Sequence, residues 1–198
     1  PAVNDVDKEV FAKLKLLNMV PSDLASDEQF LRRIYIDTIA QLPSPDEVRA
    51  FLADKSPDKR TKLVDKLLAH PLHSAVWATK LSDITGNNTD ALERPIQLQP
   101  RRSQLWHDWL RKRIAENQPY DQLVRDILTA TSRDGMDAGE WLAFVKKTDT
   151  KMEKNGFDTD YENKKTLDLF WRRQQQVPVE QWGEKVAAAF LGVRLECA

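Results

Sequence analysis

The sequence predicts an all-α fold, an irregular multi-helix bundle of about seven to nine helices that forms a single helical domain over residues 1–198. Apolar residues recur three or four positions apart through most of the chain, and almost no run shows the strict alternation of a half-buried strand. Glycine is scarce, at 6 residues. Several of the periodic segments begin with helix-capping residues, so helix starts as well as helix interiors are encoded locally.

The first two helices are predicted from their apolar spacing and from the residues that precede them. The segment DVDKEVFAKLKLL has Asn4 or Asp5 as its cap residue. The segment SDEQFLRRIYIDTIAQL opens with Ser26 and Gln29 at the spacing of a capping box, in which two backbone amides gain side-chain partners. We expect one helix in each segment.

Two near-identical helix starts follow, SPDEVRAFL from Ser44 and SPDKRTKLVDKLL from Ser56. In each, serine is the predicted cap, and proline occupies the first helical position, where its missing N–H costs nothing. The second of these helices is expected to end at His70 and Pro71. The segment LHSAVWATKLSDI then predicts another helix, which closes near Gly86.

The middle of the chain is predicted to hold two helices behind a polar connector. The connector is NNTDALERPIQLQP, and the segment SQLWHDWLRKRI after it places its apolar residues on one helical face. Asn117 and Pro119 interrupt the pattern before a second helix begins in YDQLVRDIL. Because the break is short, we expect these two helices to pack against each other.

Residues 132–165 are predicted to form a charged, partly mobile insertion. The stretch KKTDTKMEKNGFDTDYENKK is dense in charges of both signs, and Trp141 with its apolar neighbours supports only one short helix. Helical periodicity returns in LDLFWRRQQQ and in VEQWGEKVAAAFLG, which is expected to dock against the bundle and to stop at Gly192. Residues 192–198 are expected to form an extended surface tail.

Composition argues against two classes of partner. The chain has 30 basic and 31 acidic residues, for a formal net charge of -1, whereas a nucleic-acid surface needs clustered and uncompensated Lys and Arg. No apolar run approaches the roughly 20 residues of a membrane-spanning helix. The single cysteine permits no disulfide within the chain. We therefore expect a globular domain that binds no nucleic acid and has no membrane span.

No metal or catalytic site is predicted from side-chain spacing. His70 and His73 lie near metal-ligand spacing, but Pro71 breaks the helix that would align them. The alternating acidic residues of DTDYEN, residues 158–163, lack the glycine and the closing glutamate of a calcium loop, so a solvated loop is expected. No catalytic constellation is identifiable, and a non-enzymatic role is expected.

Six tryptophans are the most unusual feature of the composition. Three of them stand among Leu, Ile and Val at helical spacing and are expected to fill the core: Trp77, Trp109 and Trp182. The other three leave two interpretations open: Trp106, Trp141 and Trp171. They either complete the same core or form a platform that binds carbohydrate or protein.

Three stretches, in a fixed order along the chain, resemble a known family. Residues 31–71 contain LRRIYIDTIAQLPSPDEVRAF and LVDKLLAHP, residues 106–128 read WHDWLRKRIAENQPYDQLVRDIL, and residues 187–198 read AAAFLGVRLECA. Together they resemble the planctomycete family known as the second cytochrome-associated domain, a domain of unknown function. In that family the third stretch leads into a C-x-x-C-H motif, which attaches haem.

The resemblance implies that Cys197 is the first thiol of such a motif. In c-type cytochromes two thiols bond covalently to haem and the adjacent histidine ligates the iron. Since one thiol is half of the motif, these 198 residues are expected to carry no haem, whereas c-type haem is expected in the full-length protein. Cys197 is expected near the surface, beside an apolar patch against which a porphyrin could pack.

Two functions follow as expectations. The first, implied by the resemblance, is a non-catalytic helical scaffold in a periplasmic or extracellular multidomain protein, which serves electron transfer with an unidentified redox partner. The alternative is a carbohydrate- or protein-binding module of a cell-surface protein, with a cell-surface polymer as partner. The alternative is motivated by Trp106, Trp141 and Trp171.

Overall fold

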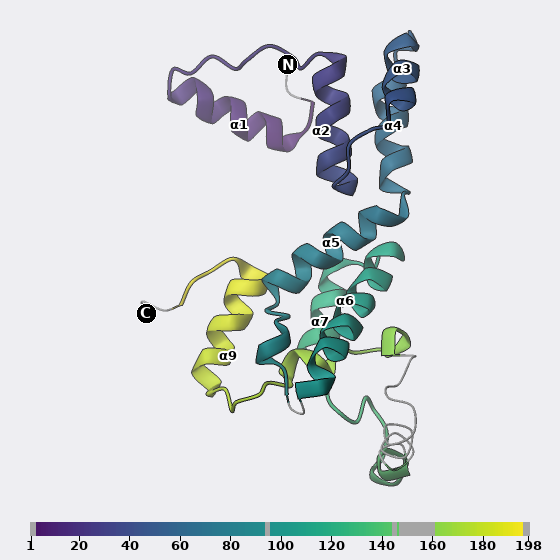
Figure 1. Ribbon diagram of the computed structural model, residues 1–198. Coiled ribbons are helices and arrows are strands. Elements are labelled where there is room, and N and C mark those ends of the chain that lie inside the picture. The colour runs from purple at the N-terminus through teal and green to yellow at the C-terminus, as the bar shows by residue number, and fades with distance from the viewer. Residues whose placement is uncertain (1–2, 94–95, 144–145, 147–160, 196–198) are drawn as a thin grey trace. The chain divides into compact units, whose positions relative to one another are not determined.

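The all-α prediction is confirmed by a computed structural model of the chain (Figure 1). The structure describes residues 3–93, 96–143, 146 and 161–195. Within these residues the regular structure is helical and no strand is found, apart from one isolated backbone bridge between Leu92 and Arg173. The apolar period of the sequence therefore identified the fold class correctly.

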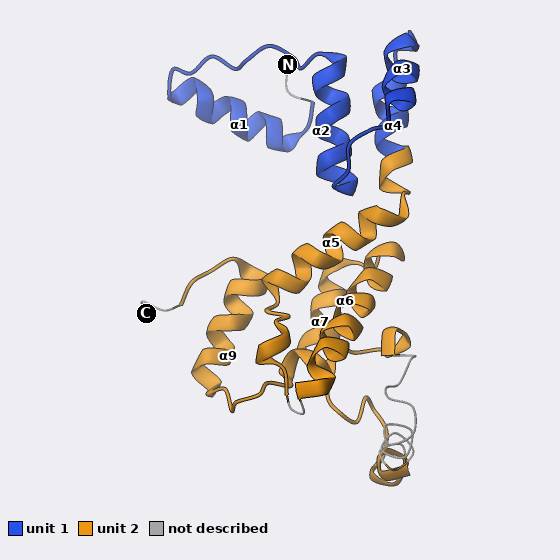
Figure 2. Cartoon of the chain, viewed as in Figure 1, with its two compact units in different colours: residues 1–65 blue, residues 66–198 orange. Residues whose placement is uncertain are grey.

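The chain divides into two compact units, residues 1–65 and residues 66–198, coloured blue and orange in Figure 2. We call them unit 1 and unit 2. Each unit is described by itself below. The prediction of a single helical domain over residues 1–198 stays a prediction.

Unit 1 is built from helices whose starts are set by local capping chemistry. The helices are α1 (Asp5–Leu16), α2 (Asp27–Ile39), α3 (Pro45–Ala53) and the first part of α4 (Lys59–Leu68). Asn4, Ser26 and Ser44 each form a capping box with the residue three positions later, and of the two predicted caps for α1 the structure selects Asn4. The predicted cap at Ser56 is wrong, because a turn at residues 57–58 intervenes and α4 begins only at Lys59.

The core of unit 1 is small and excludes α1. Its buried apolar side chains come from α2 and α3: Leu31, Tyr35, Ile39 and Phe51. Phe30 stacks on Phe51 with ring centroids 6.2 Å apart. Helix α1 has no buried residue, and its predicted apolar face is exposed within the described part of unit 1, with Val6 at 70% exposure.

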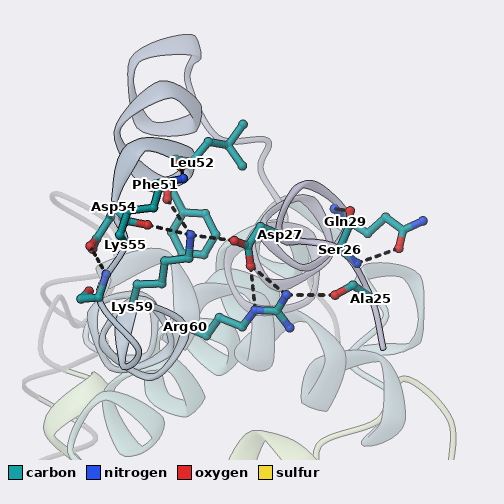
Figure 3. Close-up of polar contacts among 11 residues, drawn as sticks. Ala25, Ser26, Asp27, Gln29, Phe51, Leu52, Asp54, Lys55, Lys59 and Arg60 are labelled. Carbon is teal, nitrogen blue, oxygen red and sulfur yellow. Dashed lines mark hydrogen bonds and ion pairs between the residues drawn. The ribbon is translucent and has the colours of Figure 1, made fainter. Parts of the chain in front are cut away.

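A charge network around Asp27 fastens α2 to α4, as Figure 3 shows. Arg60 donates from Nε and from a terminal nitrogen to one carboxylate oxygen of Asp27, at 2.9 and 2.8 Å, and Lys59 Nζ lies 2.6 Å from the other. The two cations also lie over aromatic rings, Lys59 over Phe51 and Arg60 over Phe30, each 4.8 Å from the ring centroid. Asp27 therefore joins the helix pair at the edge of its apolar core.

The carboxylate of Asp27 should make the stability of unit 1 depend on pH. Hydrogen bonds from Lys59 and then Arg60 hold the pKa of Asp27 below its ordinary value of 3.8. The stabilisation is therefore fully present above pH 3.8 and is lost as the pH falls through the lowered pKa of the folded state. Asp27→Asn should lower the thermal unfolding midpoint at pH 7, and the difference from the parent protein should shrink below pH 3.8. Circular dichroism melts between pH 7 and pH 2 measure this.

The matched control for this experiment is Asp65→Asn, which changes an exposed carboxylate on α4. It should leave the midpoint almost unchanged at every pH. A deficit in Asp27→Asn that stays the same size from neutral to acid pH would contradict the assigned role.

Unit 2 contains the longer helices and the main core. Its helices are α5 (Pro71–Ile84), α6 (Gln99–Ala115), α7 (Tyr120–Leu128) and α9 (Val179–Val186), with residues 138–143 also helical. His70 caps α5, since its Nδ1 accepts from the backbone N–H of Leu72 at 3.2 Å. Gly86 and Asn117 have positive φ values of 74° and 52°, so the predicted breaks after α5 and α6 are confirmed.

The region between α7 and α9 differs in part from the prediction. The stretch LDLFWRRQQQ is not a helix: it contains one short 3₁₀ turn, Asp168–Trp171, and then runs irregularly toward α9. Within the predicted charged insertion, residues 132–165, Tyr161 is buried and belongs to the core, while the bounds of the insertion stay a prediction. In both places contacts to distant residues outweigh local propensity. The central residues of the insertion, 147–160, and with them the prediction of its mobility, lie outside the described residues.

The core of unit 2 centres on Phe170, which is 1% exposed. Its ring contacts four other aromatic rings at centroid distances between 5.0 and 5.9 Å: Trp106, Trp171, Trp182 and Phe190. Trp182 and Phe190 come from the segment VEQWGEKVAAAFLG, so the prediction that this segment docks against the bundle is confirmed. Gly192 ends it with φ 65°, as predicted.

Removing the central ring should strongly destabilise unit 2. Phe170→Ala should lower the free energy of unfolding by about 3–5 kcal/mol, because the mutation removes apolar contacts and leaves a cavity among rings. Phe170→Leu, which keeps most of the volume, should cost about 1–2 kcal/mol. Leu142→Ala, at a 52% exposed position, is the control and should change the value by less than about 0.5 kcal/mol. Urea unfolding followed by tryptophan fluorescence measures all three, and equal effects of Phe170→Ala and Leu142→Ala would contradict the packing role.

Candidate functional site

The structure distributes the tryptophans differently from the sequence prediction. Trp109 is fully buried and Trp182 packs against the core, as predicted, but Trp77 is 41% exposed and is not a core residue. Trp77 lines a small surface pocket with Ile114 of α6 and Leu123 of α7, and Lys80 lies over its ring at 4.7 Å. Apolar residues three or four positions apart share one face of a helix. The spacing does not show whether a neighbouring helix covers that face completely.

The three tryptophans with an open interpretation occupy different environments. Trp106 has no exposed surface, so contact with a ligand would require the core to open. Trp171 is half-buried and donates its Nε1–H to the carbonyl of Ile127 at 3.0 Å. Trp141 is half-buried with Arg133 above its ring. The structure does not bring them together into one platform, and ligand binding by these rings stays a prediction.

The remaining candidate ligands are placed only in part. Cys197 lies outside the described residues, as do the first acidic positions of DTDYEN. Pro71 stands at the first position of α5, so His70 precedes the helix while His73 is inside it. Among the described residues, no group of three His, Cys, Asp or Glu side chains is arranged to hold a metal ion.

The irregular segment of residues 161–174 is fastened by side chains of other elements. Its backbone carbonyls accept hydrogen bonds from α6: Trp109 Nε1 donates to Lys164 at 2.9 Å, and Arg113 donates to Glu162 at 3.2 Å. At its end, the backbone N–H of Gln174 donates to the carbonyl of Ala91 at 3.0 Å. These bonds replace the helical ladder that the segment lacks.

A buried carboxylate, Asp168, anchors the centre of this segment. It is 3% exposed and accepts from Tyr161 Oη at 2.7 Å, from Lys164 Nζ at 3.3 Å and from Arg172 at 2.9 Å. Burial, together with the adjacent Asp168 carboxylate, raises the pKa of Tyr161 well above 10.0, so the phenol remains a donor at neutral pH. A cluster this enclosed is suited to holding the segment in place rather than to meeting a substrate.

Breaking this cluster should be costly, because it leaves the buried Tyr161 hydroxyl and two partly buried cations without their carboxylate. Asp168→Ala should lower the free energy of unfolding by about 3–5 kcal/mol, and Tyr161→Phe by about 1–3 kcal/mol. Glu162→Ala, at an exposed neighbouring side chain, should have little effect. Urea unfolding at pH 7 tests the series, and a normal stability of Asp168→Ala would refute the anchoring role.

A surface groove follows the segment as it leaves the core. Two pockets, of about 630 and about 580 Å³, share four lining residues, Arg173, Gln174, Gln175 and Val177. The larger is also lined by the end of α5 and by Asn88, Asp90 and Lys185, and the smaller by two tryptophans and Pro178. We call the two together the Arg173 groove.

Arg173 is the central side chain of this groove. Its guanidinium donates to the carbonyls of Gly86 at 2.7 Å and Thr85 at 3.3 Å, at the end of α5. It also lies over the rings of Trp106, Phe170 and Trp182, 5.0 to 5.8 Å from their centroids. Burial lowers the pKa of Arg173 to about 10, so the side chain is still a cation at neutral pH.

Sequence analysis missed this groove because WRRQQQ was interpreted as a helix. One signal was available: three consecutive glutamines and Pro178 follow the two arginines, and no apolar residue continues the helical period through Gln176. The partners of Arg173 could not be inferred, since Thr85 and Gly86 are almost ninety positions away in the sequence.

The fold and the site define a helical protein with a polar surface groove and a densely aromatic core. No described helix is both long and apolar enough to cross a membrane. The chain belongs to the PSCyt2 family, described as a protein of unknown function (DUF1549), whose family model matches residues 5–198. Neither the curated proteins nor the solved structures gave a match to this chain. The family resemblance seen in the sequence is thereby confirmed, whereas planctomycete origin and an adjacent haem motif stay predictions.

Proposed function

We propose that this chain is a helical scaffold that precedes a c-type haem site in an extracytoplasmic multidomain protein and serves electron transfer. The observation that carries the proposal is Cys197, which stands where the family-like stretch AAAFLGVRLECA leads toward a haem-attachment motif. The family name PSCyt2 supports it by hinting at an association with cytochromes. The scaffold role is also consistent with a buried charge cluster that fastens structure instead of reaching a substrate.

The residues of this chain would contribute apolar surface and one thiol toward haem. Leu191, Val193 and Leu195 precede Cys197 and are 73%, 47% and 43% exposed, so apolar side chains are available on the surface before the thiol. Exposed apolar surface of this kind suits contact with a porphyrin. The second thiol and the axial histidine of the motif are not among these 198 residues, which alone do not complete the attachment. Haem, when bound, supplies the reversible one-electron chemistry.

The test is expression of a longer segment of the parent gene in a host that matures c-type cytochromes. We expect haem absorption that persists after denaturation and acid–organic extraction, because thioether bonds are covalent. Cys197→Ala should remove one thioether and shift the pyridine haemochrome band of the remainder. Absence of covalent haem, or a gene in which no C-x-x-C-H motif includes Cys197, would overturn the proposal.

The second candidate is a binding module for a carbohydrate or protein of the cell surface. The Arg173 groove is the observation that favours it, because the groove combines amide side chains, a cation and the rings of Trp171 and Trp182. Of the three tryptophans that motivated this candidate, only Trp171 lines the groove. The two candidates use different parts of the chain and do not exclude each other.

A further inference from the structure

The Arg173 groove has the dimensions and continuity for an extended ligand. Each of its two pockets, at about 630 and about 580 Å³, is in the range of small-molecule sites. Because both are lined by residues 173–175 and Val177, they adjoin along one stretch of backbone. A ligand that fills both would therefore be a short chain of units instead of one compact molecule.

The charges of the groove favour a negative ligand. Arg173 and Lys185 both line the larger pocket, against one carboxylate, Asp90. In the described part of the chain Arg173 has no carboxylate partner, and its guanidinium contacts backbone carbonyls and aromatic rings instead. Since burial disfavours this cation, an anion that reached the guanidinium would offset part of its lost hydration.

Arg173 also keeps unused hydrogen-bonding capacity. A guanidinium has five N–H donors, and the described residues accept from NH1 and NH2 of Arg173 through Gly86 and Thr85. Its Nε is buried and has no partner in the described chain. The contacts that hold the guanidinium in place therefore orient it without satisfying it, which is the arrangement expected of a preorganised anion-binding side chain.

The other side chains of the groove suit a ligand with hydroxyl groups. Asn88, Gln174 and Gln175 bring amide groups, which can both donate to and accept from hydroxyls. In the smaller pocket Trp171 and Trp182 lie 4.7 Å apart between ring centroids and present aromatic surface, to which the apolar faces of sugar rings can pack. Amides, aromatic rings and a fixed cation together match a carboxylated sugar better than a simple anion without rings or a purely apolar ligand.

We propose that the Arg173 groove binds an acidic oligosaccharide, with a carboxylate of the sugar at Arg173 and Lys185 and a neighbouring ring at Trp171 and Trp182. This inference rests on the second candidate function, a cell-surface binding module, and gives that function its site and its class of ligand. It is independent of the haem proposal.

The first experiment measures binding to the 198-residue chain itself. Trigalacturonate is the probe, maltotriose is the neutral trisaccharide control, and inorganic phosphate is the simple anion. Because Arg173 lies over Trp106 and Trp182, ligand binding should change tryptophan fluorescence, and calorimetry gives the affinity independently. We expect saturable binding of trigalacturonate that weakens with added salt, with maltotriose and phosphate at least about tenfold weaker.

Variants then locate the site. Lys185→Gln removes an exposed cation with little effect on folding and should weaken trigalacturonate binding by about 3- to 10-fold. Arg173→Gln should weaken it by more than about tenfold, with circular dichroism used to confirm that the variant is folded. The control is Lys165→Gln, an exposed lysine that lines neither pocket of the groove, which should leave the affinity unchanged.

The outcomes separate failure of the site from failure of the function. Binding that survives both Lys185→Gln and Arg173→Gln would overturn the site and leave a binding module with its ligand elsewhere. Equal affinity for maltotriose or phosphate would overturn the acidic oligosaccharide as the class of ligand. If no probe bound, both the proposed site and the acidic oligosaccharide as its ligand would be overturned. The haem test would be unaffected.

Discussion

One constraint governs unit 2: the irregular segment of residues 161–174 runs through its core, and part of the segment's backbone is buried there. Polar backbone groups that leave water must find partners, and residues 161–174 form only two short 3₁₀ turns, which satisfy few of these groups. The partners are long side chains of α6, since Trp109 and Arg113 donate to carbonyls of the segment while their own aliphatic and aromatic parts fill the core. Asp168 performs the reverse task, because it accepts from the cations that the segment itself carries.

The same constraint explains why the groove exists. A helix over residues 167–176 would have covered its own backbone and buried one continuous face. The irregular path instead turns Phe170 into the aromatic cluster and directs Arg173 to the last carbonyls of α5. Gly86 suits the turn that presents these carbonyls, because its φ of 74° lies in the left-handed region that glycine adopts without strain. The chain beyond Arg173 is left on the surface, where its amides line a hollow instead of a helix face.

Features that depend on residues close together in the sequence could be predicted, and features that depend on residues far apart in the sequence could not. The starts at Ser26 and Ser44 were predictable, since a capping box is complete within four residues. Ser56 shares only Ser-Pro-Asp with Ser44, because Lys59 stands where Ser44 has the capping-box residue Glu47. A lysine cannot accept from the cap N–H, and the helix starts later. The sequence did not show that Trp77, predicted as core, is exposed, or that Trp106, left open, is buried, because both stand at helical spacing and only their neighbours differ. The groove depends on contacts between residues 85–91 and 173–174, which no local pattern encodes.

Helix α9 and the π-helical turn after it, Ala187–Leu191, link the features discussed so far. One side of this element contributes Trp182 and Phe190 to the aromatic core, while Lys185 and Ala188 line the groove. The element ends at Gly192, and the last residues of the sequence, which include Cys197, follow it. A rigid contact with the core therefore fixes both the cation of the groove and the point from which the tail departs. A π-helical turn is rare and often occurs where function constrains a helix, and here it carries Phe190, which contacts Phe170, and ends at the left-handed Gly192.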